Sequence, residues 1–208
     1  QNEQDNRYYA KLSGLPMLEP SSVPEAQKMI PYAFEISEKL REPVLFRTTT
    51  RINHSSEIVT TSEIPGRTTK GDFQKDPFNY VTVPAVSRKL HQTLLKHQKE
   101  AGIISETCQF NFTEGNGKYG VICNGISYKY VSDAIKELKV QDRVKILRIG
   151  FSHPMPSVLV TDFLKGCDKV LMVEEGEPCM EETIKAIAQE AGITIPIKGK
   201  GEQLFSRL

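Results

Sequence analysis

GVICNGISYKYVSDAIKEL, residues 120–138, is the stretch that decides the fold. It opens on an apolar run that lacks the apolar–polar alternation of a half-exposed strand, as is typical of a strand buried on both faces. From Ser127, apolar residues recur at the spacing of one helix face: Val131, Ala134, Ile135 and Leu138. The stretch therefore predicts a buried strand followed by a helix that packs on it.

The same pattern returns along the last third of the chain. Apolar runs at 144–149, 169–173 and 194–197 start about 25 residues apart, and helical patterns begin between them at about Ser157 and at Pro178. Strands that alternate with helices in this way predict β-α-β units, in which the strands are parallel. We expect an α/β fold with a mainly parallel sheet and flanking helices over residues 118–208.

The first 55 residues predict part of a second α/β unit. Ser22 and Glu25 have the spacing of a capping box, so a helix is expected to begin there. Pro31 has no backbone N–H and should kink or split this helix. A short strand is expected at 43–46. One such unit does not bury both faces of its sheet, so residues 1–55 are expected to be the end of a larger α/β domain.

Residues 56–117 predict a linker that wraps over the surface and contains one helix, at about 85–101. Leucines in this helix alternate with four cations, which are Arg88, Lys89, Lys96 and Lys99. A basic helix of this kind can bind nucleic acid. A solvated helix with one packed apolar stripe is the interpretation that we favour.

Three glycines, Gly115, Gly117 and Gly120, have the G-x-G-x-x-G spacing of dinucleotide-binding proteins. In those proteins the glycines follow a strand and open a helix, whose N–H groups face the pyrophosphate. Here they precede the apolar run at 120–125, so we predict a turn that leads into a strand. The alternative interpretation, a dinucleotide-binding enzyme, would be supported by the three glycines alone.

Composition and charge fit a soluble globular protein. The net charge is +1, with 38% hydrophobic and 25% charged residues, so no strong overall field favours nucleic acid or a membrane surface. No run reaches the ~20 apolar residues of a membrane-spanning helix, and the polar start of the chain does not resemble a signal peptide. The four cysteines form no C-x-x-C pair and indicate reduced thiols. We therefore expect a cytoplasmic protein with neither nucleic acid nor membrane as its partner.

Residue types that carry active-site chemistry give weak signals in this chain. The four histidines have no partner at metal-ligand spacing, so no metal site is predicted. Cys123 lies in an apolar run and is expected to be a core thiol rather than a nucleophile. Glu174, Glu175 and Glu177 follow a predicted strand. They could serve acid–base chemistry, but a solvated turn before a helix is the interpretation that we favour.

Three predicted loops, 124–127, 150–156 and 174–178, leave the carboxyl ends of predicted parallel strands. That edge is where α/β sheets bind ligands or partner domains. We take four residues of these loops as interface candidates: Ser127, His153, Glu174 and Glu175. For the histidine, a role in holding a turn or a domain contact is favoured. No residue is predicted to be catalytic.

At the level of whole motifs, two segments resemble a known family. QNEQDNRYYAKLSGLPMLEPSSVPEA (1–26) and PVLFRTTTRINHSS (43–56) resemble the end of the pyrimidine-binding domain of the 2-oxoacid:ferredoxin oxidoreductases. The linker that starts GDFQKDPFNY (71–80), and the strands and loops of 121–178, resemble the domain that follows, which has the transketolase C-terminal-like fold. The resemblance covers nearly the whole chain and is greatest to the alpha subunits of the indolepyruvate-oxidising members.

This resemblance implies a thiamine diphosphate enzyme with Mg²⁺ and 4Fe-4S clusters. It also implies the other domains of the same subunit, a second (beta) subunit and ferredoxin as partners. The family's activating glutamate, diphosphate motif and cluster cysteines do not match any of these 208 positions. Only five residues are candidates for a position near the cofactor or substrate: Gln1, Asn2, Glu3, Asp5 and Arg7.

The piece by itself is expected to be structural, to form subunit interface, to be inactive and to bind no cofactor tightly. A stand-alone interaction module without enzyme activity is the alternative.

Overall fold

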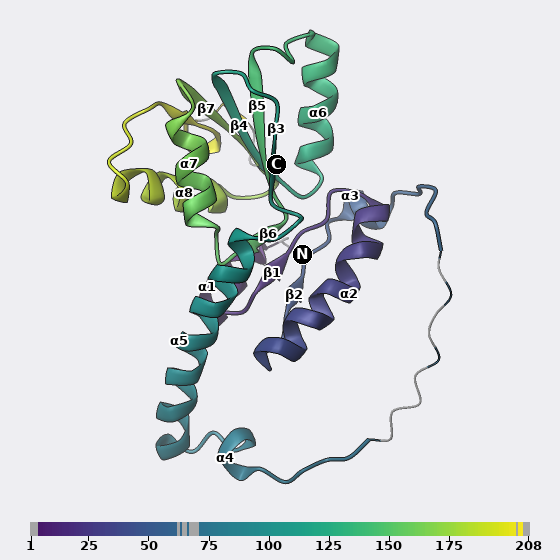
Figure 1. Cartoon of the computed structure of the whole chain (residues 1–208), viewed down its shortest axis with the longest axis vertical. Coiled ribbons are helices and arrows are strands. Elements are labelled where there is room, and N and C mark those ends of the chain that lie inside the picture. Colours follow the sequence, from purple (N-terminus) through teal and green to yellow (C-terminus); the bar gives the residue numbers. More distant parts are fainter. Residues whose placement is uncertain (1–3, 62, 64–65, 67–70, 203, 206–208) are drawn as a thin grey trace.

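The protein consists of a larger and a smaller β-sheet that share one continuous stretch of chain, as a computed structural model shows (Figure 1). The structure describes residues 4–61, 63, 66, 71–202 and 204–205. Strand β5 (Val144–Ile149) belongs to the larger sheet and strand β6 (Phe151–His153) to the smaller one. Only Gly150 separates the two strands, so the sheets are joined through the backbone at this glycine.

The larger sheet has the strand order β3-β5-β4-β7-β8, and its members besides β5 are β3 (Phe112–Glu114), β4 (Tyr119–Asn124), β7 (Lys169–Val173) and β8 (Ile197–Lys198). All neighbours are parallel except the antiparallel edge strand β3. One face is covered by α6 (Ser127–Leu138) and the other by α7 (Ser157–Lys165) and α8 (Cys179–Glu190) (Figure 1). The predicted parallel α/β sheet is confirmed.

Strand β4 shows why the apolar run at 120–125 decides the fold. Ile122 packs in the core beneath α7 and α8, whereas Val121 and Cys123 pack beneath α6. Because successive side chains point to opposite faces of a sheet, a strand covered on both faces needs apolar residues at every position. The short strand β8 begins at Ile197, later than the run at 194–197 suggested.

The smaller sheet has the order β2-β1-β6, in which β1 (Met17–Leu18) and β2 (Leu45–Phe46) are parallel and connected by α2 (Val23–Leu40). The expected β-α-β unit of the first 55 residues is therefore present, between α1 (Arg7–Ser13) and α3 (Thr50–Asn53). One expectation here is wrong, because 150–156 is not all loop. Phe151–His153 pairs antiparallel with β1, and the buried side chain of Phe151 anchors it in the core beneath α2.

Helix α2 runs unbroken through Pro31, so of the two predicted effects the split does not occur, and the kink stays a prediction. Pro31 lies on the exposed face of α2, where the carbonyl that loses its N–H partner can bind water instead. Ser22 caps the helix as expected, with its Oγ accepting from the amide of Glu25 at 3.3 Å. The Glu25 carboxylate does not complete the capping box on Ser22; it accepts from the amide of Ser21 at 2.6 Å.

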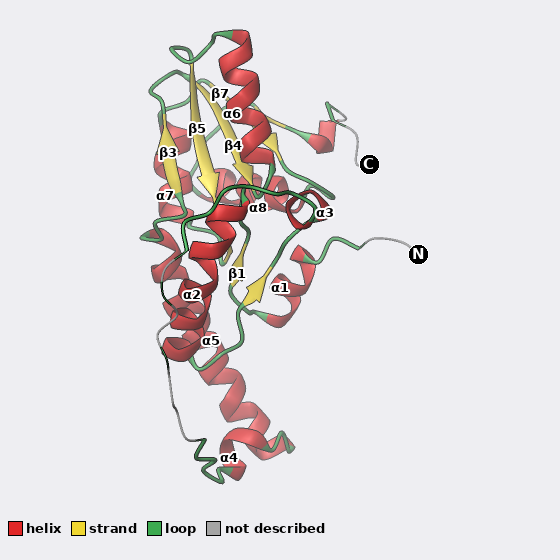
Figure 2. Ribbon diagram, turned by 90° about the vertical axis from the view of Figure 1, so that its right-hand side faces the viewer, coloured by secondary structure: helices red, strands yellow, loops and turns green. Residues whose placement is uncertain are grey.

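The predicted linker contains α4 (Pro77–Tyr80) and α5 (Pro84–Glu106), which is longer than the helix expected at 85–101. Its last turns enter the core with Ala101, and Cys108 and Phe110 follow there. The edge strand β3 lies in the same range and was not expected. Figures 1 and 2 show α4 at the far end of α5, away from both sheets.

Gly115 and Gly117 of the G-x-G-x-x-G pattern lie between β3 and β4, and Gly120 is the second residue of β4, so the glycines lead into a strand rather than a helix, as predicted. Each permits a close approach that a side chain would prevent. A Cβ at Gly117 would lie 2.0 Å from the backbone carbon of Arg143, and one at Gly120 would lie 2.6 Å from Sγ of Cys167. Gly115 has a φ of +76°, which favours glycine.

We predict opposite effects of alanine at two glycines. Gly117→Ala forces two backbone segments apart and should lower the free energy of unfolding by about 2–4 kcal/mol. Gly102→Ala, in the interior of α5 with no atom near the added methyl group, should raise it by about 0.5–1 kcal/mol. Urea unfolding of the two variants and the parent measures both. Equal stability of Gly117→Ala and parent would contradict the close approach.

Candidate functional site

Polar side chains from both sheets meet where the strands β1, β2, β4 and β7 end. We call this set the carboxyl-edge cluster; it comprises Asp5, Arg7, Glu19, Arg47, Asn124 and Glu174. Glu19 follows β1, Arg47 follows β2, Asn124 ends β4 and Glu174 follows β7. Asp5 lies just before α1 and Arg7 is its first residue, and both side chains join the cluster. The geometry confirms that the carboxyl edge gathers polar residues, as the sheet topology predicts.

Arg7 is the centre of the first half of the cluster and is 4% exposed. Its guanidinium forms ion pairs with Asp5 and Glu174 and donates to the carbonyls of Glu175 at 2.5 Å and Glu177 at 2.7 Å. Burial alone would lower the pKa of Arg7, but the hydrogen bond to Asp5 and the charges of Glu19 and Glu174 outweigh it and raise the pKa. Arg7 thus fixes the loop after β7 onto the N-terminal segment.

Glu174 is 5% exposed, so the expectation of a solvated turn is wrong for this residue. Its carboxylate accepts from the amides of Met180 at 2.8 Å and Glu181 at 2.9 Å, which are free N–H groups in the first turn of α8. Burial raises the pKa of Glu174 and outweighs the opposing effect of Arg7. Asp5 has a lowered pKa: burial would raise it, but hydrogen bonds and the charge of Arg7 prevail.

Glu19 is the centre of the second half and is 1% exposed. Its carboxylate pairs with Arg47 at 2.5 Å and accepts from the Asn124 amide at 2.9 Å. Arg47 also donates through Nε to Asn6 at 2.6 Å. The buried carboxylate of Glu19 therefore connects three strand ends and, through Arg47, the N-terminal segment. A buried charge is stable only with such ionic and hydrogen-bonding partners.

His153 lies beside the cluster on β6. It lines a small cavity of about 20 Å³ together with Lys11, Glu19, Asn124 and Ser152, a volume that admits about one water molecule. Burial and the positive charge of Lys11 lower the pKa of His153 to about 4, so the imidazole is neutral at pH 7. The structure brings His153 and Glu174 to the same region, as expected for residues of the carboxyl edge.

The other candidates are placed as follows. Ser127 is buried in the first turn of α6. Glu175 is half-buried and pairs with Arg51 at 3.3 Å. Asp5 and Arg7 belong to the carboxyl-edge cluster, whereas the candidates Gln1, Asn2 and Glu3 lie outside the described residues. Interface and cofactor roles for all of these residues stay predictions.

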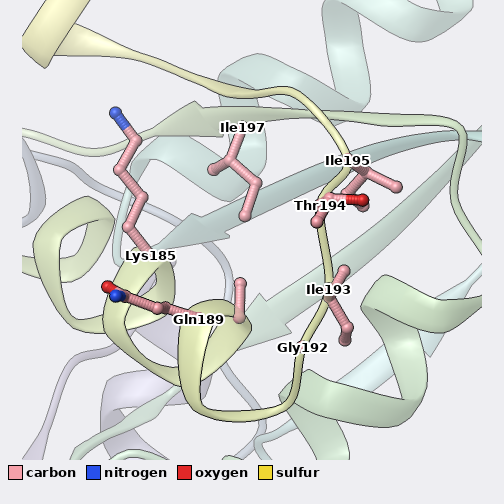
Figure 3. A pocket seen from close by; sticks show the side chains of 8 residues that line it. Lys185, Gln189, Gly192, Ile193, Thr194, Ile195 and Ile197 are labelled. Carbon is pink, nitrogen blue, oxygen red and sulfur yellow. The ribbon is translucent and has the colours of Figure 1, made fainter.

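A second, larger depression of about 350 Å³ lies at the other end of α8 (Figure 3). Its walls are the last turns of α8 and the chain that leads to β8, with Ile193, Ile195 and Ile197 as apolar lining. The only charged group in its lining is Lys185, which pairs with Glu181 at 2.7 Å. No residue predicted as functional lies there, and its open, mostly aliphatic lining offers no group for acid–base chemistry.

Within the described part of the chain, no three His, Cys, Asp or Glu side chains are grouped so as to hold a metal ion. All four cysteines are buried and unpaired by disulfides. Cys123 is fully buried in the core beneath α6, as expected for a core thiol, and burial raises its pKa to about 12. No helix among the described residues is long and apolar enough to cross a bilayer.

Sequence reasoning missed Glu19, Arg47 and Asn124 as members of the cluster. A signal was present, because each is a polar residue at the end of an apolar run, where the chain leaves a strand. It could not be used for Glu19, since the two-residue strand before it is too short to show a period. For Arg47 it was available, because this residue directly follows the strand expected at 43–46.

No known protein-family model matches the chain. Whole proteins do match. Indolepyruvate oxidoreductase subunit IorA of Thermococcus kodakarensis is 45% identical over 207 residues, which cover 96% of this chain and 32% of that subunit. IorA of Methanothermobacter thermautotrophicus is 39% identical over 203 residues, with the same two shares. This chain is homologous to about a third of IorA. The resemblance found in the sequence motifs is confirmed.

Among solved structures, 2-oxoglutarate:ferredoxin oxidoreductase from Magnetococcus marinus superposes with a TM-score of 0.60. The match covers 95% of this chain and 42% of that one, at 16% identity. At this identity the match shows the fold alone. It extends over both sheets, so the α/β arrangement with a mainly parallel sheet is shared with that enzyme. The chain spans about a third of the length of its IorA relatives.

We predict that Arg7→Met lowers the free energy of unfolding by about 3–5 kcal/mol, because Asp5 and Glu174 stay buried without their cation. Arg51→Met is the matched control. It removes a pair on the surface, where such pairs contribute at most about 1 kcal/mol. Urea unfolding at neutral pH compares the two. A loss for Arg7→Met as small as that for Arg51→Met would show that Arg7 does not hold the cluster.

A second prediction concerns pH. The pKa of His153 is lowered from 6.5 to about 4 in the folded chain, so the unfolded chain binds the proton first as the pH falls. The contribution of neutral His153 to the free energy of unfolding is fully present above the unfolded-state pKa of 6.5, and it is lost as the pH falls from there toward the folded-state pKa of about 4. Between about pH 7.5 and pH 5 the parent should lose about 2 kcal/mol more than His153→Gln. Parallel urea titrations at both pH values test this; equal losses would rule out the buried neutral imidazole.

Proposed function

We propose that this chain is part of the alpha subunit of a thiamine diphosphate-dependent 2-oxoacid:ferredoxin oxidoreductase, with indolepyruvate as the substrate. The observation that carries the proposal is the identity of 45% to a subunit named indolepyruvate oxidoreductase IorA, over nearly the whole chain. Within the proposed enzyme, residues 1–55 are the end of the pyrimidine-binding domain, 56–117 the connecting linker, and 118–208 the transketolase C-terminal-like domain.

The described residues do not fit the proposed cofactors, as their donor chemistry shows. The buried thiols have pKa values raised by burial and are dispersed over the core, which disfavours a cluster of thiolate ligands. The carboxylates of the carboxyl-edge cluster are already paired with Arg7 and Arg47. We therefore derive no catalytic step from this chain and propose that the residues holding thiamine diphosphate, Mg²⁺ and 4Fe-4S clusters lie in the rest of the polypeptide.

The role left to this piece is to hold two domains in a fixed relation. The carboxyl-edge cluster supports such a role, because it joins the N-terminal segment and β1 to strand ends of the larger sheet through buried ion pairs. Single, well-paired arrangements of buried charge favour one relative geometry over others. A rigid connection of this kind is what two cofactor-binding domains need in order to keep their reacting groups aligned.

The alternative is a stand-alone interaction module with the same fold and no activity. Large apolar side chains on two helices favour a binding surface in either case: Leu12 on α1 and Phe34 on α2 are largely exposed. These exposed side chains fit either hypothesis. In the interaction module they would contact a partner protein; in the enzyme they would contact its other domains, its second subunit or ferredoxin.

Intact mass of the native polypeptide in its source cell distinguishes the two. We expect about three times the 23.4 kDa of this chain, since the matched relatives are about three times longer. A native product of 23.4 kDa would contradict the oxidoreductase and support the interaction module.

The structural role of the piece is tested in parallel by thermal unfolding of the 208-residue chain with thiamine diphosphate and Mg²⁺. We expect no shift of Tm. A rise of several degrees would show a cofactor site within the piece, because a ligand at about 100 times its Kd stabilises by about 2.7 kcal/mol.

A further inference from the structure

The N-terminal half of α5 extends away from both sheets (Figures 1 and 2). The C-terminal half of α5 is fixed to the part of the protein that contains the two sheets, which we call the body. Nδ1 of His97 lies 3.0 Å from Oε1 of Glu42, and the Glu106 carboxylate accepts from the amides of Val158 and Leu159, both at 2.9 Å. The side chains of residues 84–96 are exposed except those of Val86, Leu90 and Leu94, which are half-buried. We call residues 84–96 the α5 arm.

One face of α5 runs from the core into the arm, with polar residues between two apolar parts. Ala101 and Ser105 are buried in the body. His97 and Gln98 lie one turn earlier on that face, and Leu94, Leu90 and Val86 follow at spacings of four residues. These three apolar side chains, which we call the arm stripe, are only half-buried. Apolar side chains in line on a helix indicate a face that packs against protein.

The cations near the arm lie on one side of the stripe and behind it. At about 100° per residue, Lys89 and Lys96 lie about 100–120° around the helix from the centre of the stripe, whereas Arg88 and Lys99 lie on the opposite face. Residues 84–99 contain no carboxylate. The one ion pair described for these cations joins Lys96 to Glu100 across 3.8 Å at the surface. Antiparallel pairing of two copies of the arm would bring like charges together, which disfavours a second copy of this chain as the occupant. The complementary surface is apolar where it meets the stripe and has an acidic rim beside Lys89 and Lys96.

We propose that the α5 arm docks on an apolar surface with an acidic rim in the part of the same polypeptide outside these 208 residues. This inference rests on the proposed function, under which about two thirds of the subunit lies elsewhere in the chain, as the 32% coverage of IorA implies. A surface in the same polypeptide is present at a high effective concentration near the arm. The arm should therefore bind it in preference to a separate protein with a similar apolar and acidic surface.

Zero-length carbodiimide cross-linking of the full-length polypeptide, purified without its second subunit, tests the proposal. The reagent joins lysine amines to carboxylates in direct contact. We expect Lys89 and Lys96 to be joined to Asp or Glu residues outside the 208-residue segment. In a mixture of ¹⁴N- and ¹⁵N-labelled protein these products should carry a single label. Mixed-label products would assign the arm to a second copy. Products that form only after the second subunit is added back would assign the arm to that subunit, and either result overturns the proposal.

A pair of variants shows whether the stripe directs the contact. Leu90→Asp places a carboxylate in the apolar stripe and should reduce these cross-links at least tenfold. Leu138→Asp, at a 70% exposed leucine on α6, should leave them unchanged. Equal cross-link yields from both variants would overturn docking through the stripe. Cross-links that appear only after nuclease treatment would overturn it too, because they would show that the cations of the arm are bound to nucleic acid. The two proposals fail in different ways. If the native polypeptide has the expected length but these cross-links are absent, only the docking is refuted. If the native mass is 23.4 kDa, the proposed function is refuted.

Discussion

The buried guanidinium of Arg148 is the interaction on which the arrangement of the two sheets depends. Arg148 is fully buried near the end of β5. It pairs with Glu25 of α2 and donates to the carbonyl of Glu19 at 3.0 Å and to the carbonyl of Phe110. Burial lowers its pKa, and the charge of Glu25 opposes this effect. One cation of the larger sheet thus holds the helix and a strand end of the smaller sheet in place, since a charge in the interior needs all of these partners.

The passage of the chain from one sheet to the other is determined next to this side chain. Asn111 accepts from the amides of Gly150 at 2.7 Å and Phe151 at 2.8 Å, which no strand partner satisfies at the junction. A Cβ at Gly150 would lie 1.7 Å from Nη1 of Arg148, so only glycine leaves room for the guanidinium. β5 and β6 can therefore belong to different sheets although one residue separates them.

The carboxyl-edge cluster depends on this junction. Glu19 accepts from Asn124 only because the end of β1 is held beside the end of β4, and Arg148 bonds the backbone of the same Glu19. The homology to IorA gives this local geometry its meaning. The chain matches about a third of the length of IorA, and within it buried ion pairs connect strand ends of the two sheets, which is the observation behind the proposed structural role.

The sequence by itself determined the elements with a strong period. The apolar runs of β4, β5 and β7 and the positions of α6, α7 and α8 were predicted nearly to the residue, because a sheet covered on both faces leaves a continuous apolar signal. The expected strand at 43–46 contains β2. In the predicted stripe of α6, Val131 and Ile135 pack on the sheet, whereas Ala134 and Leu138 are exposed. The tertiary structure alone decided the rest. The short strands β1 and β6 show no period, Pro31 is tolerated because its face is exposed, and Glu174 is buried because Arg7, distant in sequence, neutralises it. Contacts between residues far apart in the chain leave no pattern in a single sequence.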